Sequence, residues 1–233
     1  GTEFYATRMY QHGDDISRID WNRRAKTGEL STVLFRKEQA ATVVLLVDNE
    51  PDAYVAPEPH AEHAVDRAVT AAGRLFATIA DEGHFVGISS LAETDCWLQP
   101  GRGSSHRSRA RTLLATHPAL QSRRSDGQGN PTRVREKLKR RLPPNAQVIV
   151  LSPVCRQSIV RFVRELEATD HPVTVLSPDP TADRTPSQQL ARVGRRVNIT
   201  DLRQDGVPVV DWDWDESLAS ALARFAEHQE VTV

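Results

Sequence analysis

The chain has 233 residues, of which 30 are Lys or Arg and 31 are Asp or Glu, so its formal net charge is −1. This length suits one α/β domain with a substantial core, and a hydrophobic content of 39% with a charged content of 26% is typical of a globular protein. No apolar run is long enough to cross a bilayer and no signal peptide is visible, while two cysteines without companion ligands argue against a disulfide scaffold or a zinc site.

The N-terminal segment from Arg8 to Trp21 (RMYQHGDDISRIDW) combines opposite charges, glycine and aromatic rings at high density. Side chains of these types satisfy one another through hydrogen bonds and ion pairs when they pack together. We therefore expect a structural latch folded onto the domain, with Tyr10 and Trp21 as core aromatics. A ligand site is the alternative.

Two strands are predicted after this segment. Residues 28–39 alternate between apolar and polar side chains and contain several β-branched residues, which favours a strand. Residues 41–47 form a continuous apolar run, which is typical of a strand buried on both faces at the centre of a parallel sheet. The Asp48–Asp52 segment that follows has the composition of a loop.

The remaining chain alternates between helical and strand patterns. Helices are predicted over residues 61–82, 106–116, 132–142, 156–168, 185–193 and 215–228. Strands are predicted over residues 85–91, 147–151, 172–176, 197–202 and 207–210, with a short hairpin partner over 94–98. Alternation of this kind predicts an open, mostly parallel sheet with helices on both faces.

Charge is distributed unevenly along the chain. Residues 102–141 hold 12 Lys or Arg against 2 Asp or Glu, and the rest of the chain holds 18 against 29. We expect the basic segment to form helices whose charges are simply solvated. The alternative is that the basic side chains form a binding face. Nucleic-acid binding is not favoured, because the segment contains no Phe, Tyr or Trp that could stack on bases. The side chains that such binding would use are Arg107, Arg109, Arg111, Arg133, Arg135, Lys137, Lys139, Arg140 and Arg141.

Three carboxylates, Asp48, Glu50 and Asp52, follow the predicted central strand. Ligands of open α/β sheets bind beyond the carboxyl ends of the strands, and alternate residues of an extended loop can point the same way. Carboxylates that converge repel one another, and a hard cation such as Mg²⁺ or Ca²⁺ relieves the repulsion. The pattern therefore indicates a candidate cation site. The alternative is that Asp48 caps the strand end and the other two carboxylates are solvated.

The N-terminal pattern R-x-Y-x-x-G-D-D-x-x-x-I-D-W, with Gly1-Thr2-Glu3-Phe4 before it and Ala25-Lys26 after it, resembles the domain of unknown function 58 family. The resemblance extends through Val47-Asp48 and more weakly to about Leu151. It implies a von Willebrand factor A-like fold, which is a Rossmann-like α/β fold with an open, mostly parallel sheet and helices on both faces.

The resemblance also implies a division of the chain. Residues 1–40 hold the family motif and an edge strand, and residues 41–233 hold the von Willebrand factor A-like domain. Because the chain starts inside the motif without an initiator Met, we expect a fragment of a cytoplasmic protein. A membrane anchor outside the fragment is compatible with the family.

Von Willebrand A-type domains carry a metal site with D-x-S-x-S in the loop after this strand, a Thr in a second loop and an Asp after a later strand. In this sequence Asp48 matches the first Asp, whereas Glu50 and Asp52 stand where the two serines would be. Thr132 stands at the Thr position, and Pro153 replaces the last Asp. The resemblance therefore implies a degenerate metal-ion-dependent adhesion site of Asp48, Glu50, Asp52 and Thr132, which binds Mg²⁺ or Ca²⁺ weakly.

Proteins that resemble this chain commonly accompany MoxR-type AAA+ ATPases in the chaperone-like assembly of other complexes. The resemblance implies a non-enzymatic protein–protein interaction module with such an ATPase as its partner. The sequence contains no G-x-S-x-G, phosphate-loop or dinucleotide motif, so we expect no catalysis. The alternative is a Mg²⁺-dependent hydrolase in which Asp48, Glu50 and Asp52 hold the cation and the basic segment engages a phosphoester or polyanion.

Overall fold

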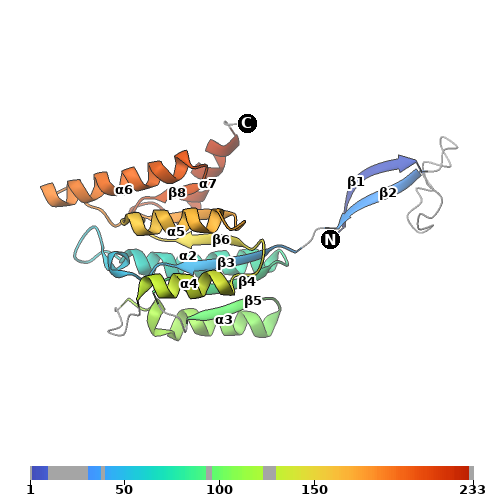
Figure 1. The fold of residues 1–233 in the computed structure, drawn as a ribbon, viewed down its shortest axis with the longest axis horizontal. Coiled ribbons are helices and arrows are strands. Elements are labelled where there is room, and N and C mark those ends of the chain that lie inside the picture. Colours follow the sequence, from blue (N-terminus) through green and yellow to red (C-terminus); the bar gives the residue numbers. More distant parts are fainter. Residues whose placement is uncertain (1, 10–30, 38–39, 93–95, 123–129, 231–233) are drawn as a thin grey trace. The chain divides into compact units, whose positions relative to one another are not determined.

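The computed structural model describes residues 2–9, 31–37, 40–92, 96–122 and 130–230 of the chain. The chain divides into two compact units, residues 1–40 and residues 41–233, which are drawn in Figure 1.

The first unit is a two-stranded antiparallel sheet. Its strands are β1 (Thr2–Met9) and β2 (Ser31–Lys37), and their register shifts between Phe4 and Ala6. The strand predicted over residues 28–39 is therefore present as β2. Residues 10–30, which hold most of the predicted latch, lie outside the described residues, so the latch stays a prediction.

The second unit is built on a six-stranded sheet. Its strands are β3 (Thr42–Val47), β4 (Phe85–Ser90), β5 (Trp97–Gly101), β6 (Gln147–Leu151), β7 (Val173–Pro178) and β8 (Val209–Trp212). They lie in the order β5-β4-β3-β6-β7-β8, and only the pairing of β5 with β4 is antiparallel. The apolar run after residue 40 is thus central, as predicted, with a parallel neighbour on each side.

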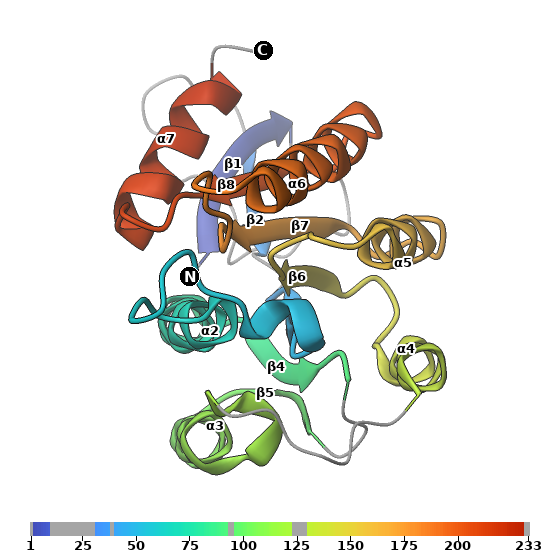
Figure 2. The same cartoon turned by 90° about the vertical axis from the view of Figure 1, so that its left-hand side faces the viewer.

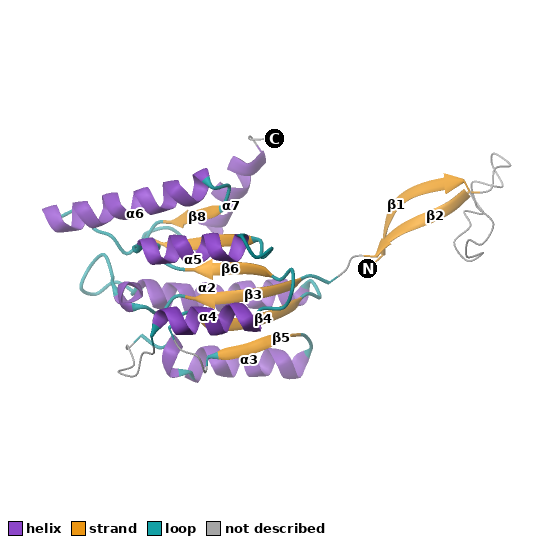
Figure 3. Cartoon of the chain, in the orientation of Figure 1, coloured by secondary structure: helices purple, strands orange, loops and turns teal. Residues whose placement is uncertain are grey.

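Helices cover both faces of this sheet, as Figures 2 and 3 show. One face carries α2 (Ala64–Asp81), α3 (Ser104–Thr116) and α7 (Leu218–Glu230). The other face carries α4 (Pro131–Arg141), α5 (Gln157–Glu167) and α6 (Pro186–Gln204). Two short 3-10 helices, η2 (Pro51–Tyr54) and η3 (Pro118–Leu120), lie in the connections. The architecture is the open, mostly parallel α/β sheet with helices on both faces that the sequence predicts.

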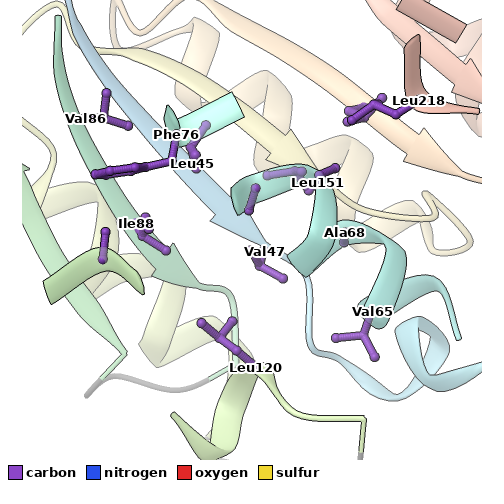
Figure 4. Packing of buried hydrophobic residues seen from close by; sticks show 14 of the residues in the cluster. Leu45, Val47, Val65, Ala68, Phe76, Val86, Ile88, Leu120, Leu151 and Leu218 are labelled. Carbon is purple, nitrogen blue, oxygen red and sulfur yellow. The ribbon is translucent and has the colours of Figure 1, made fainter. Parts of the chain in front are cut away.

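Side chains of β3 alternate between two hydrophobic cores, one on each face of the sheet. Val43, Leu45 and Val47 belong to the core closed by α2 and α7 (Figure 4), whereas Val44 and Leu46 belong to the core on the opposite face. All five side chains are at most 4% exposed. Burial on both faces explains why the run is apolar at every position instead of alternating with polar residues.

One predicted strand is wrong. Residues 197–202, predicted as a strand, form the C-terminal part of α6. This helix begins with a capping box, in which the Thr185 hydroxyl accepts from the Gln188 N–H and the Gln188 side chain accepts from the Thr185 N–H. Ile199 and Leu202 are then buried at helical spacing. The cap and the buried face outweigh the local preference of β-branched residues for strands.

The strand order reverses between β3 and β6, because the chain first builds outwards through β4 and β5 and then places β6 on the other side of β3. Ligand sites of doubly wound sheets lie beyond the carboxyl ends of the strands at such a reversal. Asp48 directly follows β3 and Ser152 directly follows β6, so both residues lie at this position.

Candidate functional site

Asp48 links the loops that follow the two central strands. Its carboxylate accepts hydrogen bonds from the Ser152 hydroxyl at 2.5 Å and from the Glu50 N–H at 2.9 Å. The Ser152 oxygen in turn accepts from the Val154 N–H at 3.1 Å. Asp48 is 3% exposed and Ser152 is fully buried, so this polar connection lies inside the protein.

The environment of Asp48 raises its pKa from 3.8 to about 6. Burial is the largest cause, because it disfavours the charged form, and the neighbouring carboxylate of Glu50 adds to the effect. The hydrogen bonds from Ser152 and from the Glu50 N–H act in the opposite direction, since they stabilise the carboxylate. Asp48 therefore changes its charge close to neutral pH.

Glu50 forms a buried ion pair with α4. Its carboxylate lies 2.5 Å from a guanidinium nitrogen of Arg135, and the two side chains are 5% and 12% exposed. Arg135 also donates to the Ser158 carbonyl at 3.0 Å and lies over the Phe162 ring. Its Nε is buried and has no partner among the described residues. Glu50 is thus neither solvated nor free to bind a ligand.

Asp52 pairs with the start of α5. Its two carboxylate oxygens accept from Nε and Nη2 of Arg156, the second at 2.9 Å. These side chains are 33% and 47% exposed, so this pair lies at the surface. Asn49, which stands between Asp48 and Glu50, accepts from the Ala92 N–H in the loop after β4 at 2.8 Å. The loop from Asp48 to Asp52, hereafter the 48–52 loop, is therefore tied to four different parts of the sheet domain.

Thr132, the fourth predicted metal ligand, lies in the first turn of α4 and is exposed. Its N–H donates to the Asn130 side chain, which caps the helix. In the part of the chain that the structure describes, no three His, Cys, Asp or Glu side chains are grouped so that they could hold a metal ion. Asp48, Glu50 and Asp52 share one edge of the sheet, but each faces a different protein partner. This set of engaged oxygens does not fit Mg²⁺ or Ca²⁺, which require several converging free oxygens.

The sequence interpretation missed Ser152, Arg135 and Arg156 as partners of the 48–52 loop. Arg135 lies in the basic segment for which the sequence predicts solvated helices. The neighbouring Val134 and Leu138 are buried at helical spacing, and this periodicity is the signal that places Arg135 beside the inner face of α4. No comparable signal marks Arg156.

The loop after β6 is strained at Val154, which has a φ of 54° and is fully buried. A β-branched residue rarely adopts this left-handed conformation, and it persists only where the surroundings impose it. Arg195 donates to the Pro153 carbonyl at 3.0 Å and Asn198 donates to the Val154 carbonyl at 2.9 Å, so α6 holds the loop. Cys155 lies in the same loop, and burial raises its pKa to about 12, so its thiol stays protonated.

Two large apolar side chains are exposed at this edge of the sheet. Val55 follows η2 and is 46% exposed, and Trp214 follows β8 and is 51% exposed. Arg67 supports the second loop, because it donates to the Asp213 carbonyl at 2.6 Å and stacks on the Trp212 ring. We call the surface that exposes Asp52, Val55, Arg156 and Trp214 the carboxyl-edge surface.

In the residues that the structure describes, the basic segment of residues 102–141 does not form one face. Its helices α3 and α4 lie on opposite faces of the sheet (Figure 2). Arg107 pairs with Asp81, and Lys139 lies 2.6 Å from Glu136 and 2.9 Å from Glu165. Part of the positive charge is therefore neutralised within the protein, and the rest is divided between two surfaces.

Comparison with protein families establishes where the chain belongs. The family described as "Protein of unknown function DUF58" matches residues 6–231. The chain belongs to this DUF58 family. No curated protein matches this DUF58 chain. In the part of the chain that the structure describes, no helix is both long and apolar enough to span a membrane.

Two solved structures are similar to this DUF58 chain. A conserved hypothetical protein BatB from Bacteroides thetaiotaomicron is 17% identical with a TM-score of 0.50, and the match covers 83% of this chain and 99% of BatB. At this identity the likeness concerns the fold alone. The SpRpn10 VWA domain is 10% identical with a TM-score of 0.40, and the match covers 79% of this chain and 94% of that domain.

Proposed function

We propose that this DUF58 domain is a non-enzymatic protein-interaction module that recognises its partner through the carboxyl-edge surface. The exposed Val55 and Trp214 are the observation that supports this proposal most directly. Aromatic residues surrounded by polar groups are enriched among the side chains that dominate binding energy at interfaces. The loops that carry Val55 and Trp214 are held by hydrogen bonds to the sheet domain, so binding would require little ordering of the surface.

The proposed partner is a MoxR-type AAA+ ATPase, with which the domain acts in chaperone-like assembly. The family membership supports this choice, since proteins that resemble the chain commonly accompany such ATPases. The Asp52–Arg156 pair adds one exposed charge of each sign to the carboxyl edge of the sheet. Charges at the rim of an interface select the orientation of the partner more than they add affinity.

We further propose that the recognition surface keeps its shape without a metal ion. Arg135 and Arg156 supply positive charge to Glu50 and Asp52, which is what a cation would otherwise do for these carboxylates. Binding of Mg²⁺ or Ca²⁺ to the 48–52 loop is then weak. The same pairing disfavours the hydrolase alternative, because metal-assisted hydrolysis needs carboxylates that are free to bind the ion.

The test is affinity capture from an extract of the source organism, with mass spectrometry of the retained proteins, carried out with and without EDTA. We expect a MoxR-type ATPase to be retained under both conditions. Retention that disappears in EDTA would contradict the metal-independent surface. A capture without any AAA+ ATPase would contradict the proposed partner.

A further inference from the structure

Helix α6 has two apolar faces, of which only one packs against the sheet. Ile199 and Leu202 are at most 2% exposed and belong to the core. Leu190, Val193 and Val197 are 73%, 55% and 52% exposed. Because these three positions are spaced by three and four residues, they form one stripe along the outer side of the helix. We call them the α6 stripe.

The stripe is not explained by the folding of α6 itself. Its three members make up most of the large apolar side chains exposed in the described part of the chain, the others being Val55 and Trp214. Valine also forms helices less readily than the straight-chain polar residues that usually occupy exposed positions. Contiguous exposed apolar side chains with charged neighbours are characteristic of interaction sites.

Positive charge lies beside the stripe. Arg192 and Arg196 occupy neighbouring turns of α6, one helical row away from Val193 and Val197. Arg192 pairs with Asp183 at 3.1 Å. Within the described ranges, Arg196 forms no ion pair.

We propose that the α6 stripe is a docking site for an amphipathic helix of another protein that carries carboxylates beside its own apolar stripe. The three residues span seven positions, which is about 10 Å along a helix and equals two turns of a docking helix. Carboxylates on the docking helix would meet Arg196 and relieve the repulsion between Arg192 and Arg196. A second copy of this chain fits less well, because antiparallel pairing through a twofold axis sets the same arginines against each other.

The probe for the test is a synthetic amphipathic peptide with leucines at positions i, i+3 and i+7 and glutamates on both flanks. Its binding to the whole chain is measured by fluorescence anisotropy. We expect micromolar affinity that weakens with added salt, because part of the attraction is between exposed charges. A matched peptide with lysines in place of the glutamates should bind about tenfold more weakly or not at all.

Two variants locate the site. Val193→Glu removes apolar surface and adds a repelling carboxylate, and Arg196→Glu reverses one charge while leaving the stripe intact. Each should raise the Kd of the glutamate peptide by about tenfold or more and leave the melting temperature nearly unchanged, because both positions are exposed. Arg133→Glu, at an exposed position of α4 that belongs to neither proposed surface, serves as the control and should leave peptide binding unchanged.

Three results would overturn the proposal. Equal binding of both peptides, or affinities that the two α6 variants do not change, would show that the stripe does not select an acidic helix. Sedimentation as a dimer that Val193→Glu converts to a monomer would show that a second copy of the chain occupies the stripe. Because these measurements use no ATPase, their outcome is independent of the partner proposed for the carboxyl-edge surface.

Discussion

The guanidinium group of Arg135 lies 2.5 Å from the carboxylate of Glu50, and both side chains are largely buried. Glu50 stands in the loop where the sequence indicates a cation site, and its partner is a cation that belongs to the chain itself. The pair connects two residues that are 85 positions apart, since Glu50 follows the central strand and Arg135 lies in α4. It therefore fixes the position of the 48–52 loop against the helical layer.

We predict that Arg135→Met destabilises the domain by about 3–5 kcal/mol, because it leaves the Glu50 carboxylate buried without its partner. The double variant Arg135→Met with Glu50→Leu should recover most of this loss, since it removes both charges. Urea unfolding at neutral pH measures both effects. Arg133→Met is the matched control, because Arg133 is exposed on the same helix and its substitution should change the free energy of unfolding by less than about 0.5 kcal/mol. If Arg135→Met alone leaves the free energy of unfolding close to that of wild type, water reaches the Glu50 carboxylate.

The raised pKa of Asp48 predicts a pH dependence of stability. Between the unfolded value of 3.8 and the folded value of about 6, the folded protein binds more protons at Asp48 than the unfolded chain does. The proton bound at Asp48 therefore stabilises the folded protein. This stabilisation is fully present below about pH 4 and is lost as the pH rises through about 6. Asp48→Asn should remove that slope, because an amide cannot ionise; its oxygen can still accept from the Glu50 N–H, and its NH2 group can donate to the Ser152 oxygen.

The measurement is urea unfolding of wild type and Asp48→Asn at intervals from pH 4 to pH 7. The stability of the variant relative to wild type should increase with pH across this range. Asp215→Asn, at an exposed position, serves as the control and should follow the wild-type profile. Parallel profiles of wild type and Asp48→Asn would show that Asp48 is not the group that titrates.

The sequence predicts the sheet domain well because its signals are local. The apolar run of residues 41–47 reports burial on both faces of β3, and this property needs no knowledge of its neighbours. The error at residues 197–202 has a different origin. The capping box at Thr185 lies outside the segment, and Leu202 favours the helix only because the helix packs against the sheet domain.

For the candidate site, the sequence predicts where the acidic residues lie but not which residues they contact. The positions of Asp48 and Asp52 at the carboxyl end of β3 follow from the strand pattern. Their partners Ser152 and Arg156 are both 104 residues away, and their pairing depends on how the loops after β3 and β6 meet. Charge patterns along a sequence carry no information on contacts over such separations.

Metal titration tests the role of the two arginines. We expect calorimetric titration with Mg²⁺, Mn²⁺ or Ca²⁺ to show weak binding at most, because the oxygens of the 48–52 loop already have partners. Arg156→Ala frees the Asp52 carboxylate and should strengthen binding only slightly, since Asp48 and Glu50 stay engaged. Tight binding that survives Asp48→Ala would place a metal site elsewhere in the protein.

The carboxyl-edge surface provides the test that bears most directly on function. Truncation of an aromatic side chain at the centre of an interface typically costs at least about 2 kcal/mol of binding free energy, which is about 30-fold in Kd. We therefore predict that Trp214→Ala, and to a smaller extent Val55→Ser, weakens binding to the MoxR-type ATPase while the melting temperature stays close to wild type. Arg133→Ser, at an exposed position of α4 that belongs to neither proposed binding surface, is the control. The same variants, together with Asp48→Ala and Asp52→Ala, should be assayed against a panel of phosphoester and nucleic-acid substrates with added Mg²⁺. Turnover that depends on Asp48 and Asp52 would contradict the interaction module and support the hydrolase. Loss of ATPase binding without turnover in any variant would support the interaction module.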